Sequence, residues 1–87
     1  MGITHSEFFR TLPTALAPSP YTVQDHDVII SDNTRRLIIS LSPESRRRLG
    51  ALSLPTTQVR FAFSGYSPHD IDRFMARFDR AFQRGGG

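Results

Sequence analysis

Five large apolar residues near the end of the chain recur at the spacing of an α-helix. They are separated by three, one, three and four positions, and they are Ile71, Phe74, Met75, Phe78 and Phe82. This spacing places them on one side of a helix, which then needs an apolar surface to cover that side. Ser67 and Pro68 are typical of an N-cap and a first helical residue, so we predict a helix over about 68–84.

β-Branched runs in the middle of the chain can form the surface that this helix needs. Turn signals at Asp25-His26 and Asp32-Asn33-Thr34 separate predicted strands near 21–24, 27–31 and 35–41. A fourth strand is predicted after Pro55 and ends at Gly65. Alternation gives this sheet one apolar face, which we expect to be the core and which carries Val28, Ile30, Leu37, Ile39, Leu41, Val59, Phe61 and Phe63.

Two more helix starts complete the predicted fold. Thr4 with Glu7 forms a capping-box pattern, which predicts a helix from about residue 5, kinked or broken near Leu12 because of Pro13. The segment from Ser42 to Gly50 predicts a short connector helix of two turns. The expected fold is α+β in two layers: a four-stranded antiparallel sheet, with the N-terminal and C-terminal helices on one face and the connector helix between strands three and four.

The length of 87 residues indicates one small domain, predicted over 1–84 and followed by a flexible glycine tail at 85–87. The chain has no cysteine, which excludes disulfides and thiolate metal sites. Its longest aliphatic runs, such as Val28-Ile29-Ile30, are far too short for a membrane span. We therefore expect a cytoplasmic, bacterial protein that does not bind membranes.

Arginine supplies all 11 basic residues, and the net charge is +3. Four of them fall on the helix face opposite the apolar residues and have few acidic neighbours, namely Arg73, Arg77, Arg80 and Arg84. Three more, Arg46, Arg47 and Arg48, fall in the predicted connector helix. These two groups are the candidate binding residues, and the alternative for each is an ordinary solvated surface.

The aromatic residues bear on whether these arginines bind nucleic acid. Surfaces that bind RNA or DNA combine basic residues with exposed aromatic rings. All seven phenylalanines occupy core-facing positions, which leaves only Tyr21 and Tyr66 for such a surface. A partner protein is therefore favoured, with RNA or DNA binding through the arginines as the alternative.

The histidines do not form a pattern typical of catalysis. Strand alternation separates His26 from the carboxylates of Asp25 and Asp27, and His69 with Asp72 supplies at most two metal ligands. We expect no catalytic residue, no metal and no cofactor.

The C-terminal residues Arg84-Gly85-Gly86-Gly87 resemble the flexible diglycine end of small ubiquitin-like sulfur carriers. In that family the tail follows a strand, whereas here it follows a predicted helix. The resemblance implies a carrier function through the glycine tail, which is the second alternative.

Ile29 and Ile38 are the apolar residues expected on the outer face of the sheet, where they could support self-association. The sequence as a whole favours a small non-catalytic protein-interaction module, as a monomer or a weak homodimer.

Overall fold

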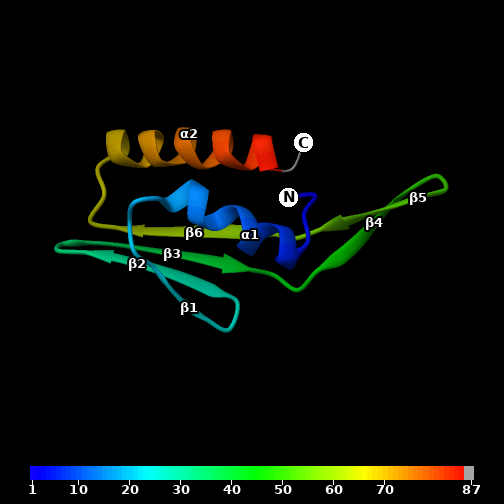
Figure 1. The fold of residues 1–87 in the computed structure, drawn as a ribbon, viewed down its shortest axis with the longest axis horizontal. Coiled ribbons are helices and arrows are strands. Elements are labelled where there is room, and N and C mark those ends of the chain that lie inside the picture. Colours follow the sequence, from blue (N-terminus) through cyan, green and yellow to red (C-terminus); the bar gives the residue numbers. More distant parts are fainter. Residues whose placement is uncertain (86–87) are drawn as a thin grey trace.

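The computed structural model describes the backbone of residues 1–85 and the side chains of residues 1–83. The chain has one helix at each end and a run of strands between them (Figure 1). In chain order the elements are α1 (His5–Leu16), β1 (Thr22–Gln24), β2 (Asp27–Asp32), β3 (Arg35–Leu41), β4 (Ser45–Leu49), β5 (Leu52–Thr56), β6 (Val59–Ser64) and α2 (Pro68–Gly85). The chain is therefore an α+β protein, as predicted.

The main sheet is antiparallel and has four strands in the order β1-β2-β3-β6. Both helices lie on one face of this sheet (Figure 1). The covered face carries the residues that alternation predicted, because Val28 pairs with Ile39 and Ile39 pairs with Phe61 across the strands. The buried core joins that face to the helices and consists of Ile3, Phe8, Leu12, Ala15, Leu16, Val28, Ile30, Leu37, Ile39, Leu41, Phe78 and Phe82.

Helix α1 begins where its capping residues predict. The Thr4 hydroxyl accepts a hydrogen bond from the Glu7 amide at 3.1 Å, and it donates one to the Glu7 carboxylate. The expected break near Leu12 is wrong, because the helix continues through Pro13 to Leu16. Pro13 is exposed while Leu12 and Leu16 are buried on either side of it, so core packing outweighs the hydrogen bond that proline removes.

Aromatic rings connect the two helices with each other and with the sheet. Phe8 of α1 stacks on Phe82 of α2 at a centroid distance of 5.1 Å. Phe78 stacks on Phe82 at 4.4 Å and meets Phe61 of β6 edge-on at 5.0 Å. The apolar side of α2 therefore faces the core, where Phe78 and Phe82 are buried, while Ile71, Phe74 and Met75 are half-buried. Within the described residues, neither helix is long and apolar enough to cross a membrane.

The predicted connector helix between strands three and four is wrong. Residues 45–56 form a second antiparallel sheet of two strands, β4 and β5, which we call the arm. The residues that signalled a helix start make bonds to distant parts of the chain. The Ser42 hydroxyl accepts from the Gln58 amide at 2.8 Å, and the Glu44 carboxylate accepts from the His5 amide at 2.6 Å. Glu44 thus satisfies an N–H at the start of α1 rather than beginning a helix of its own.

Candidate functional site

The arm projects beyond the layer of helices and sheet (Figure 1). The molecule measures 48 Å along its longest axis and 25 and 21 Å along the others, and the arm lies along the longest axis. All ten residues of the two strands are exposed except Pro55 and Thr56 next to the body. A hairpin of this kind has marginal stability in water by itself.

The two faces of the arm differ in chemistry. Arg47 pairs with Leu54 and Leu49 pairs with Leu52, so strand alternation places these four residues on one face. The leucines there are unusually open, with exposed fractions of 50% for Leu49, 64% for Leu52 and 44% for Leu54. We call this the leucine face.

The opposite face of the arm is basic. It carries Arg46 and Arg48 with their partners Pro55 and Ser53. The Arg46 guanidinium also donates to the Ser53 carbonyl at 3.2 Å, which ties the two strands together. The arm is therefore a ribbon with apolar side chains on one face and positive charge on both.

The base of the arm is held by the N-terminal segment. The Thr57 amide donates to the Met1 carbonyl at 2.7 Å, and the buried Thr57 hydroxyl donates to the Ile3 carbonyl at 2.8 Å. The His5 ring nitrogen Nε2 donates to the Ser42 carbonyl at 2.7 Å. Ser42 and Thr57 lie in the two segments that join the arm to the body. Their hydrogen bonds therefore fix the direction in which the arm leaves the body.

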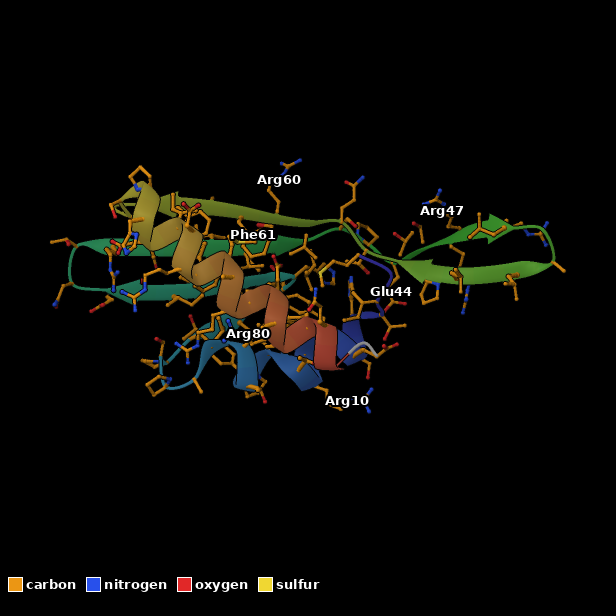
Figure 2. The ribbon with its side chains drawn as sticks, turned by 90° about the horizontal axis from the view of Figure 1, so that it is seen from above. Arg10, Glu44, Arg47, Arg60, Phe61 and Arg80 are labelled. Atoms are coloured by element: carbon orange, nitrogen blue, oxygen red, sulfur yellow. The ribbon has the colours of Figure 1, made fainter. Side chains whose placement is uncertain are left out.

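The structure separates the two arginine groups predicted as binding residues. Figure 2 shows Arg47 on the arm and Arg80 on α2, over the body of the molecule. Arg46, Arg47 and Arg48 are exposed on β4, and Arg73, Arg77 and Arg80 are exposed on α2. Arg84 lies in the last turn of α2, and its side chain is outside the described residues, as are Gly86 and Gly87 of the tail. The two groups are thus separate surfaces.

Comparisons of the chain with protein-family models, with curated proteins and with solved structures gave no match. Functional assignment therefore depends on geometry and chemistry alone.

A pocket of about 340 Å³ lies beside the first half of α2. Its polar lining includes Arg73 and Arg77 of α2 and Arg35 of β3, and its apolar lining includes Leu16, Ile30 and Phe74. Arg80 is not part of this lining. The described residues of the predicted α2 stripe therefore divide into two, Arg73 and Arg77, that line the pocket and one, Arg80, that does not.

Arg35 is held in place within this pocket by three neighbours. Its guanidinium lies 3.0 Å from the Asp32 carboxylate, 3.7 Å from the Asp70 carboxylate and 5.0 Å from the centroid of the Tyr66 ring. The hydrogen bond that Arg35 donates to the Asp32 carboxylate is the main reason that the pKa of Arg35 is raised above its ordinary value. Arg35 is thus a fixed positive charge.

The outer face of the sheet carries the pair predicted for self-association. Ile29 and Ile38 are direct cross-strand partners and are half-buried, and Ile38 is in turn opposite Ala62. The register is as predicted, while the role in a homodimer stays a prediction.

Sequence reasoning missed the leucine face and the contribution of Arg35 to the pocket. The alternation Leu52-Ser53-Leu54 before Pro55 is a strand signal for β5, but it does not give the pairing with β4 that forms the arm. Arg35 gave no such signal, because its distance from Arg73 along the chain says nothing about their proximity in space.

Proposed function

We propose that this chain is a small, non-catalytic protein-interaction module that binds a partner protein through its arm. The observation that carries the proposal is the leucine face, where Leu49, Leu52 and Leu54 are about half exposed or more on a projecting hairpin. Burying these side chains supplies a favourable free energy that the free protein does not obtain.

The chemistry of the arm specifies its partner. The leucine face needs an apolar groove, and Arg46, Arg47 and Arg48 need acidic residues along the borders of that groove. Opposite charge at the rim would speed association and set the orientation of the arm. We therefore assign to the partner an apolar groove bordered by Asp and Glu side chains.

In this proposal the histidines have no catalytic role. The His5 ring is engaged by the Ser42 carbonyl at the base of the arm, whereas His69 is exposed in the first turn of α2. His26 is exposed in the turn between β1 and β2. The three rings thus take part in local structure or contact solvent.

Nucleic acid is the less favoured occupant of the arm. A two-stranded ribbon with arginines has dimensions suited to a DNA groove. However, leucine side chains gain little from phosphates, and Phe61, Phe63 and Phe74 pack against the core rather than forming an exposed stacking surface.

The test is capture of binding partners from an extract of the native cells with four forms of the protein. These are the wild type, Leu52→Ser with Leu54→Ser, Arg46→Glu with Arg48→Glu, and Arg77→Glu with Arg80→Glu. All these positions are exposed, so each variant should keep the fold, as circular dichroism can verify. We expect the leucine variant to lose a specific protein, the arm-charge variant to bind it more weakly, and the α2 variant to bind it normally.

The identity and surface of the captured protein decide the outcome. Support requires that capture survives nuclease and that a purified partner binds through a groove with acidic borders. Loss of all capture after nuclease treatment would assign the arm to nucleic acid instead. Arm-dependent dimerisation of the purified protein in sedimentation experiments would make a second copy the occupant and contradict the proposal.

A further inference from the structure

The pocket beside α2 is a second candidate site, independent of the arm and at the opposite end of the molecule. Its lining includes Arg35 at the start of β3 and Asp70 near the start of α2. In Figure 1 the starts of β3 and α2 lie at one end of the sheet, and the arm extends past the other end. α1, the sheet and α2 all contribute to its lining. Its volume of about 340 Å³ is within the range of small-molecule sites.

The lining of the pocket has more positive than negative side chains. Arg35, Arg73 and Arg77 line it together with a single carboxylate, Asp70. Asp70 is 3.7 Å from Arg35, and Arg35 is also paired with Asp32. Among the side chains of residues 1–83, neither Arg73 nor Arg77 has an acidic partner within 4.0 Å. Two arginines therefore face the pocket with their donors available.

We propose that this pocket binds a small phosphate monoester. Arg35 is balanced by Asp32 and Asp70, whereas Arg73 and Arg77 carry two positive charges with no acidic partner among the described side chains. A phosphate monoester carries a charge of about −1.5 to −2 at pH 7 and has three acceptor oxygens, which suits two guanidinium groups with free donors. A carboxylate, with one negative charge, would offset the charge of only one of these two arginines.

The apolar part of the lining specifies the rest of the ligand. Leu16, Ile30 and Phe74 form the apolar part of the wall. The Tyr66 ring also lines the pocket, but Arg35 lies over its face and restricts stacking there. The ligand therefore has an uncharged, partly apolar body attached to the phosphate, with the phosphate directed at Arg73 and Arg77.

The experiment titrates the intact protein with phenyl phosphate at pH 7.5, using amide chemical shifts in NMR spectra to follow binding. At this pH phenyl phosphate is mostly a dianion, because its second pKa is about 6. Phenyl sulfate is the matched probe with the same shape and one charge, and inorganic phosphate is the probe without the apolar body. We expect phenyl phosphate to bind at least about fivefold more tightly than either probe.

Three variants with the same change of charge test the position of the site. Arg73→Gln and Arg77→Gln remove lining residues, whereas Arg80→Gln removes an exposed arginine of the same helix that is outside the pocket. We expect the dissociation constant for phenyl phosphate to rise about tenfold in each lining variant and less than about twofold in the control. Equal melting temperatures for all forms would show that the fold is retained.

Several results would overturn this assignment. One is the absence of saturable binding of phenyl phosphate, and another is equal weakening by all three substitutions, which would indicate general attraction to a basic surface. Equal affinities for phenyl sulfate and phenyl phosphate would show that the second negative charge of the phosphate does not contribute to binding. Tighter binding of a short phosphoserine peptide would assign the pocket to a phosphorylated protein segment rather than to a small molecule.

Discussion

At the scale of single residues, two glycines with positive φ have different surroundings. Gly50 in the turn of the arm has φ +61°, and a Cβ there would have no atom within 4 Å. Gly65, between β6 and α2, has φ +78°, and a Cβ there would overlap the Thr34 carbonyl oxygen and lie 3.3 Å from Arg35 Cα. Gly65 thus lets the chain turn toward α2 while passing close to Thr34 of the β2–β3 turn and to Arg35 at the start of β3.

Replacing Gly65 by alanine should destabilise the protein by about 2 to 4 kcal/mol, because backbone strain and steric overlap add. Gly50→Ala is the control, with backbone strain alone and a cost of about 1 kcal/mol. Urea unfolding at 25 °C measures both free energies of unfolding. Equal values for the two variants would mean that the β2–β3 turn moves aside without cost.

At the scale of secondary-structure elements, α2 contributes to the core mainly through its second half. Phe78 is 1% exposed and is surrounded by the rings of Phe8, Phe61 and Phe82, whereas Phe74 is half-buried at the wall of the pocket. The first half of the helix is therefore free to line a site while the second half holds the layers together.

This difference leads to a graded prediction for the two phenylalanines. Phe78→Ala should lower the free energy of unfolding by about 3 to 5 kcal/mol, because it leaves a cavity in a closed part of the core. Phe74→Ala should cost about half as much, since its ring already borders solvent. Chemical unfolding of both variants is the measurement, and a larger loss for Phe74 would place the centre of the core at the pocket instead.

At the scale of the whole molecule, the body and the arm are physically distinct. The buried core contains no residue of β4 or β5, while Thr57 at the base of the arm is buried and bonded to Met1 and Ile3. Stability should therefore depend on the body and the base, and not on the arm beyond them.

Shortening the arm tests this separation. Replacing residues 46–55 by Asn-Gly leaves the Ser45–Thr56 pair joined by a favoured two-residue turn. We expect the melting temperature to change by less than about 4 °C, which corresponds to less than about 1 kcal/mol in a domain of this size. Capture of the partner protein should be lost. A fall of about 10 °C or more would show that the arm contributes to folding.

The sequence by itself determined the two flanking helices, the four strands of the main sheet and which face of that sheet is buried. These features depend on local signals: the Thr4 and Ser67 caps, the helical spacing from Ile71 to Phe82, and the alternation along Leu37, Ile39 and Leu41. Local signals succeed here because the core reinforces each of them, and at Pro13 the core overrides the contrary signal.

Only the tertiary structure decided the conformation of residues 42–56 and the composition of the pocket. Ser42 and Glu44 have the sequence of a helix start, but their side chains bond to Gln58 and His5, which are distant along the chain. Arg35 meets Arg73 and Arg77 only because β3 and α2 converge at one end of the sheet. These hydrogen bonds and this cluster of arginines bring together residues whose separation in sequence follows no periodic pattern. The packing of the whole chain therefore decides both the arm and the pocket.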